Sequence, residues 1–202
     1  MSSSHRPSPL ALTVLSLLGM GPLHPYGLQR LIKLWGKDQV VNVGQRASLY
    51  KTINRLREAG LIAVHQTERD QQFPERTLYA LTDEGRLEAR AWLIDLLGAP
   101  RNEFPVFPAA LSFVMLLGPE EAAAVLGQRA DALREQLAAV DASLAGELKD
   151  LPRVAWLETE YQRTVLAAEL AWIDGVVDDL RTGALTWSYD ELMVMARSYL
   201  PE

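Results

Sequence analysis

Apolar positions in the first part of the chain recur at helical spacing and predict three helices. The first opens at Pro9, a residue favoured at the first position of a helix, and the residues after it are apolar nearly all round, which predicts a central helix. The second begins at His24 and ends at Gly36, and the third runs from Arg46 to Ala59.

The pattern then changes to alternation, which predicts a β-hairpin. Residues 61–67 and 76–81 alternate apolar and polar positions around a polar segment, with Leu78 and Leu81 as the expected inward positions of the second strand. Thr82 is a favoured N-cap residue and begins a fourth helix. Three helices followed by a hairpin are the order of a winged helix-turn-helix, which we place at residues 9–98.

The second half of the chain predicts helices only. A short apolar helix is expected over 104–117, and a long helix is expected from Pro119 to a break at Pro152. The long helix has apolar residues at steps of four and three, a coiled-coil-type seam. That seam consists of Leu126, Ala130, Leu133, Leu137, Val140 and Leu144.

The helix after Pro152 is expected to fold back on this seam and to leave a surface for a partner chain. The residues that we expect it to turn inward are Leu157, Tyr161, Val165 and Ile173. Residues 103–202 are therefore predicted to form a helical dimerisation and effector region. The predicted fold class is mainly α with a small β-hairpin.

Charge separates the two halves more sharply than their composition does. The net charge of the 202 residues is −6, but residues 1–98 hold twelve Lys and Arg against nine Asp and Glu, while residues 99–202 hold eight against seventeen. Within residues 24–57 seven cations stand against Asp38 alone. The first half therefore suits a polyanion, and the second half does not.

The third helix is the candidate that would read nucleic acid. Leu49, Ile53 and Leu56 form one stripe, so successive 100° steps put polar and basic residues on the opposite face, as in a helix that enters the major groove. The alternative is an ordinary surface helix with a solvated charged face. Candidate DNA contacts on this helix and on the hairpin are Arg46, Ser48, Tyr50, Lys51, Asn54, Arg55, Arg69, Gln71 and Arg76.

Several motifs stand in the order seen in PadR-type transcriptional regulators, which the chain resembles over about residues 9–98. They are Leu10 to Leu18, His24-Pro25-Tyr26-Gly27, Ser48-Leu49-Tyr50, Leu56-Arg57-Glu58-Ala59-Gly60-Leu61-Ile62 and Leu78-Tyr79-Ala80-Leu81-Thr82-Asp83-Glu84-Gly85. The resemblance implies a homodimeric repressor that binds double-stranded DNA through this region, pairs through its C-terminal helices and often responds to aromatic small molecules. It also implies a phosphate contact for Tyr26, for which a partly buried packing role is the alternative. The loop from Gly36 to Gly44 is longer than the family pattern.

Three tryptophans are candidates for stacking on a small aromatic effector. Trp92, Trp156 and Trp172 lie on predicted helices, and flat aromatic ligands stack on such rings. The alternative is packing in the core or in a dimer interface.

The sequence gives little support to other function classes. The chain has no cysteine, its three histidines lack the spacing of a metal pair, and it contains no GxGxxG, P-loop, HExxH or GxSxG motif. We therefore expect no enzyme, no metal and no cofactor. Without a long apolar segment we expect no membrane span and a cytoplasmic location. The rival hypothesis is a winged-helix adaptor that binds other proteins without specific DNA binding.

Overall fold

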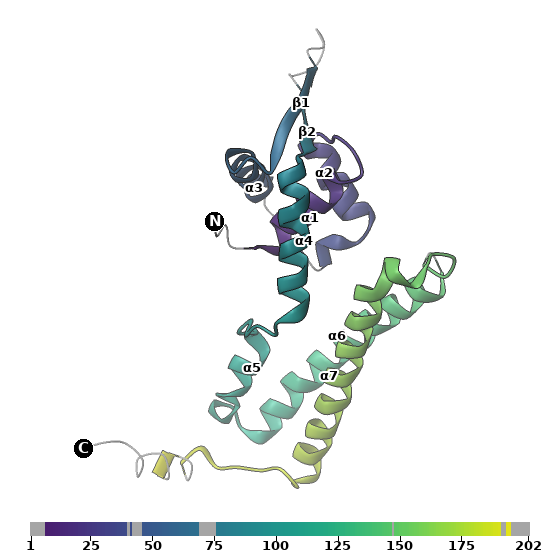
Figure 1. Cartoon of the computed structure of the whole chain (residues 1–202). Coiled ribbons are helices and arrows are strands. Elements are labelled where there is room, and N and C mark those ends of the chain that lie inside the picture. Colours follow the sequence, from purple (N-terminus) through teal and green to yellow (C-terminus); the bar gives the residue numbers. More distant parts are fainter. Residues whose placement is uncertain are drawn as a thin grey trace, which may run out of the picture. The chain divides into compact units, whose positions relative to one another are not determined.

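The computed structural model describes residues 7–39, 41, 46–68, 76–146, 148–190 and 193–194. The chain divides into two compact units, Met1–Asn102 and Glu103–Glu202 (Figure 1). The division falls at the Gly- and Pro-containing linker that follows the fourth helix. Each unit has a hydrophobic core of its own.

The first unit is a winged helix, and the predicted fold class is confirmed. The strands β1 and β2 pair antiparallel, with Ile62 opposite Leu81. The elements are α1 (Pro9–Leu18), α2 (Pro25–Leu34), the 3₁₀ turn η1 (Lys37–Gln39), α3 (Arg46–Glu58), β1 (Ile62–Glu68), β2 (Arg76–Leu81) and α4 (Asp83–Gly98).

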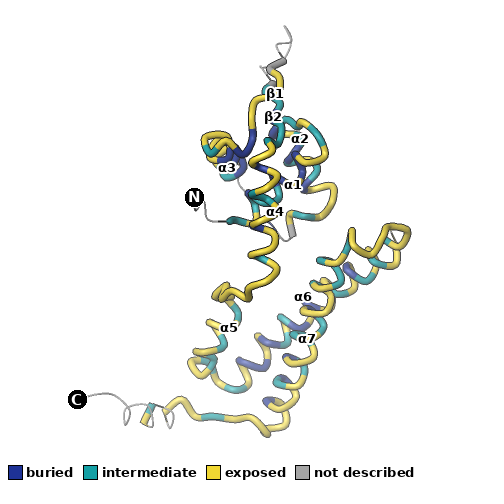
Figure 2. Tube along the Cα trace, viewed as in Figure 1, coloured by how far each residue is buried: buried dark blue, intermediate teal, exposed yellow. Residues whose placement is uncertain are grey.

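Side-chain caps and a buried stripe explain where these helices begin and which face they bury. The Ser8 hydroxyl accepts a hydrogen bond from the Ala11 amide at the start of α1, and the Thr82 hydroxyl accepts one from Gly85 at the start of α4. The predicted N-cap is therefore confirmed. Figure 2 shows the buried segments of α1, α2 and α3 in dark blue, where their apolar faces form the core of this unit.

One strand position differs from the expectation. Among the described side chains of β2, Tyr79 is the buried one, at 8% exposure, whereas Leu78 is only half-buried. The backbone of Tyr79 also exchanges hydrogen bonds with Leu23, N to O at 2.9 and 3.0 Å. This extra pairing with the chain before α2 fixes which face of the strand turns inward.

The second unit is built on two long helices. Its elements are α5 (Val106–Leu111), the 3₁₀ turn η2 (Val114–Leu116), α6 (Pro119–Ala145), the 3₁₀ turn η3 (Arg153–Trp156) and α7 (Leu157–Thr182). The single helix expected over 104–117 is thus wrong: Pro105 sets the start of α5 one residue before Val106, and the chain tightens into 3₁₀ geometry after Ser112. The long helix also ends before Pro152, because Gly146 leaves the helical backbone region at φ −103° and ψ −104°.

The predicted seam of α6 packs against α7. Leu126, Ala130, Leu133 and Val140 are buried, and the other two seam residues are half-buried. The inward face expected for α7 is only partly right. Ile173 is buried, but Leu157, Tyr161 and Val165 are 47%, 72% and 43% exposed. The residues that α7 turns inward instead are Leu166, Ile173, Val177 and Leu180, because the helix carries apolar residues on two faces and α6 covers one of them.

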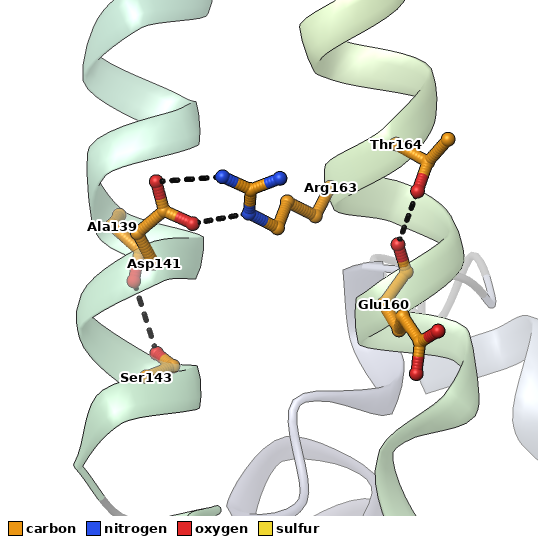
Figure 3. A network of polar contacts seen from close by, with 6 residues as sticks. All are labelled: Ala139, Asp141, Ser143, Glu160, Arg163 and Thr164. Atoms are coloured by element: carbon orange, nitrogen blue, oxygen red, sulfur yellow. Dashed lines mark hydrogen bonds and ion pairs between the residues drawn. The ribbon is translucent and has the colours of Figure 1, made fainter.

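Ion pairs between the two helices fix their alignment. Arg163 of α7 donates to the carboxylate of Asp141 on α6, as Figure 3 shows, and Arg134 of α6 pairs with Asp174. The resulting order of partners along the two helices is antiparallel. Arg153 donates to Glu160 at the start of α7, and this hydrogen bond lowers the pKa of the Glu160 carboxyl.

Candidate nucleic-acid interface

The helix α3 has one fully buried face and one open face. Leu49, Ile53 and Leu56 are 2%, 1% and 0% exposed and enter the core of the first unit. On the opposite side Lys51, Asn54 and Arg55 are exposed, so the 100° spacing places these three polar side chains together where a large ligand can reach them. Figure 2 shows this open side of α3 in yellow and teal.

Ser48 also belongs to this face, and Tyr50 borders it. Ser48 is half-buried, and Tyr50 is 48% exposed. We name Ser48, Lys51, Asn54 and Arg55 the polar face of α3. The structure brings these four predicted residues together, which the sequence spacing alone had suggested.

The start of α2 carries an exposed aromatic ring. Tyr26 is 63% exposed, so the partly buried packing role does not fit it. His24 caps this helix, because its Nδ1 accepts a hydrogen bond from the Tyr26 amide at 3.1 Å. Further along the helix Arg30 and Lys33 are also exposed. The same helix therefore offers a phenol and two cations to solvent.

Arg55 makes a contact that the sequence did not reveal. Its Nη2 lies 3.4 Å from the hydroxyl oxygen of Ser8, the residue that caps α1. The two residues are 47 positions apart, so no local pattern links them. The only local signal was a serine directly before Pro9, which is typical of a helix start. The contact holds the guanidinium of Arg55 near the first turn of α1.

Several cations on α2 and α3 are not neutralised by an ion pair within the described part of the chain. Within the part of the chain that the structure describes, Arg30, Lys33, Lys51 and Arg57 form no ion pair. In the second unit, by contrast, ion pairs neutralise four of the five arginines that the structure describes. An unpaired basic surface on α2 and α3 attracts phosphate groups.

Some predicted contacts lie outside the described residues. Arg69 and Gln71 lie between β1 and β2 in the sequence, outside the described residues. Arg46 and Arg76 lie within α3 and β2, but their side chains are likewise not described. These four residues remain predictions.

The three tryptophans have different surroundings. Trp92 is 5% exposed in the core of the first unit, which favours the packing alternative. The indole N–H of Trp156 donates to the Leu151 carbonyl at 3.3 Å. Trp172 is 50% exposed and meets the ring of Phe107 edge-on, with centroids 6.4 Å apart. Of the three, Trp172 has the most accessible ring.

Phe107 joins three helices of the second unit, a role that the sequence did not indicate. The guanidinium carbon of Arg129 lies 3.7 Å from the centre of the Phe107 ring, and Arg129 pairs with Glu169 of α7. The cation over the ring and the edge contact with Trp172 hold α5 against α6 and α7.

The described residues include no helix able to cross a membrane and no group of three acidic or histidine side chains able to hold a metal ion.

A comparison with protein families finds a match within the first unit. Residues 14–91, which run from α1 into α4, match the family described as the transcriptional regulator PadR-like family. The matched segment lies within the winged-helix unit. The resemblance noted from the sequence motifs is thereby confirmed.

Several solved structures share the fold over most of the chain. Bacillus subtilis PadR in complex with operator DNA superposes with a TM-score of 0.72 at 19% identity, covering 86% of this chain and 99% of that one. The same protein in complex with p-coumaric acid gives 0.66 at 17% identity, with 87% and 99% covered. The Vibrio cholerae virulence activator AphA gives 0.58 at 18% identity, with 86% and 98% covered.

The structural similarities show the winged-helix fold, and the family similarity covers residues 14–91. The family and the structural neighbours are described as regulators and not as enzymes. No curated protein matches the chain.

Proposed function

We propose that this protein is a transcriptional repressor that binds a palindromic DNA operator as a homodimer in the cytoplasm. The polar face of α3 carries this proposal, because it is open, basic and backed by a fully buried stripe. A helix of this kind fits the major groove, where Lys and Arg bond guanine and Asn bonds adenine. A gel-shift assay with the DNA upstream of its own gene tests the proposal, and a specific, competed shift is the expected result.

Neighbouring residues would hold the protein on the DNA backbone. Tyr26, Arg30 and Lys33 of α2 are exposed, and such side chains bind phosphate oxygens without reading sequence. Arg69, Gln71 and Arg76 of the wing are proposed to reach an adjacent groove or its phosphates. A winged-helix adaptor is the other possible use of this fold, but the unpaired cations of α2 and α3 favour DNA.

Replacing Arg55 by alanine should weaken binding to the operator more than binding to random DNA. Loss of a bidentate base contact costs about 1–3 kcal/mol, whereas loss of a phosphate contact weakens both DNAs alike. Fluorescence anisotropy with operator and scrambled duplexes measures the two affinities.

The matched control is Arg57→Ala. Arg57 is also exposed and carries the same charge, but it lies roughly 160° around α3 from Arg55. It should lower both affinities equally. If Arg55→Ala does the same, Arg55 contacts only phosphate and the base contact is wrongly assigned.

The second unit is proposed to form the dimer. Its charge balance favours a role away from DNA, and α7 keeps an apolar face that α6 does not cover. This uncovered face of α7 consists of Leu157, Tyr161 and Val165. A second copy of the chain would bury it and present two copies of α3 to two half-sites.

We also propose that an aromatic small molecule regulates DNA binding. Bacillus subtilis PadR has been solved with p-coumaric acid, and the exposed ring of Trp172 beside Phe107 offers a stacking surface. Trp156 and Trp92 are less suitable, because both are more buried. Such a ligand releases DNA only if it binds the DNA-free state more tightly.

Adding p-coumaric acid should quench the tryptophan fluorescence of the wild-type protein. The quenching should be lost in Trp172→Phe and kept in Trp92→Phe, whose indole lies in the other unit's core. Equal quenching in both variants would exclude Trp172 as the stacking ring.

A further inference from the structure

Thr82 connects the end of α3 with the start of α4. Its hydroxyl oxygen lies 2.8 Å from the Gly60 carbonyl oxygen and 2.9 Å from that of Leu61, so its hydrogen is donated to this turn. The same oxygen accepts a hydrogen bond from the Gly85 amide at 3.0 Å. The backbone amide of Thr82 also donates to the Leu61 carbonyl at 3.2 Å.

Gly85 brings the two backbones together more closely than any other residue would allow. A Cβ atom placed on Gly85 would lie 1.9 Å from the Leu61 carbonyl oxygen and 2.8 Å from a methyl group of Leu81. Only hydrogen fits this space. The first turn of α4 therefore rests directly on the turn that follows α3.

That turn is itself a rigid continuation of α3. Gly60 adopts φ +73°, and the Leu61 amide donates to the Leu56 carbonyl at 3.0 Å while the Gly60 amide donates to Arg57 at 2.9 Å. This pair of bonds is a Schellman motif, which ends a helix in a defined geometry. A displacement of α4 at Thr82 therefore moves the end of α3 with it.

We infer that Thr82 and Gly85 form a joint that positions the polar face of α3 for base reading, an inference that rests on the proposed function. Base contacts demand that the reading helix be held within a narrow range of position and angle by its supporting residues. Thr82 touches no DNA in this account. It acts through α3, as a positioning residue.

The test compares Thr82→Val with Thr82→Ser in the full-length protein. Valine keeps the shape and removes the hydroxyl, so affinity for the operator should fall by about tenfold, the size of one lost base contact, while affinity for random DNA stays unchanged. Serine keeps the hydroxyl and should restore the wild-type ratio. A Thr82→Val protein with the wild-type ratio, or a Thr82→Ser protein as impaired as Thr82→Val, would overturn the inference.

Trp92→Phe separates positioning from stability. It removes part of a buried side chain of α4 from the core of the first unit, so it should lower the melting temperature. The ratio of the affinity for the operator to the affinity for random DNA should stay unchanged. A wild-type protein without any operator preference would contradict the proposed function itself.

Hydrogen exchange of the wild-type protein tests the joint without a variant or DNA. The amides of Thr82 and Gly85 should exchange as slowly as those in the middle of α3, because both are hydrogen-bonded inside the joint. Rapid exchange of these two amides would show that the joint is loose and would overturn the inference, whatever the protein binds.

Discussion

Raising the salt concentration from about 50 to 200 mM is expected to weaken operator binding by about 10³- to 10⁵-fold. Arg30, Lys33, Lys51 and Arg55 are exposed, and a dimer doubles them. Together they would neutralise roughly 6–10 phosphates and release the associated counterions, which gives a slope of log K against log salt of about −5 to −9. Anisotropy titrations at a series of salt concentrations measure this slope.

Variants of two lysines give the control for this experiment. Lys33→Ala removes one proposed phosphate contact from each half-site and should reduce the slope by about 2 per dimer. Lys149→Ala removes an exposed charge of the second unit and should leave the slope unchanged. A binding constant that barely depends on salt would favour the protein-interaction adaptor.

Placing a charge on the uncovered face of α7 should convert the dimer into a monomer. Val165 is 43% exposed in the single chain, so the monomer tolerates glutamate at this position. Dimer formation would bury its carboxylate without an opposite charge beside it, which is costly. Loss of the second half-site should lower operator affinity by about 10²- to 10⁴-fold, since the two winged helices then bind independently. Sedimentation gives the mass, and anisotropy gives the affinity.

Ala142→Glu is the matched variant. It adds the same charge to an exposed position of α6, roughly 160° around that helix from the seam residue Leu144. It should remain a dimer with wild-type affinity. A Val165→Glu protein that still sediments as a dimer would show that this face of α7 is not the interface.

Local signals predicted most of the winged helix correctly. The stripe of Leu49, Ile53 and Leu56 sets the outward face of α3, and the N-cap of Thr82 sets the start of α4. Each signal is carried by residues that are close together in the sequence, so spacing and capping rules detect it. The same rules predicted the seam of α6.

Tertiary packing decided the points at which the prediction failed. Val165 and Leu166 are adjacent apolar residues about 100° apart on α7, and only the position of α6 decides that Leu166 is buried. The end of α6 at Gly146 was overlooked because Pro152 is the stronger helix breaker.

Contacts between segments that are far apart in the sequence could not be predicted from it either. Arg55 meets Ser8 across 47 positions, and Phe107 meets Arg129 and Trp172 from three different helices. No periodicity connects such residues. The polar face of α3 was predictable from one helix, whereas its supporting contacts required the folded chain.

Footprinting of the purified full-length protein on genomic DNA tests the central claim most directly. The account predicts protected sites that share an imperfect palindrome, with half-sites about 10 bp or a multiple of 10 bp apart, because two copies of α3 enter major grooves on one side of the duplex. Protection without a shared sequence, or no protection at low salt, would contradict it.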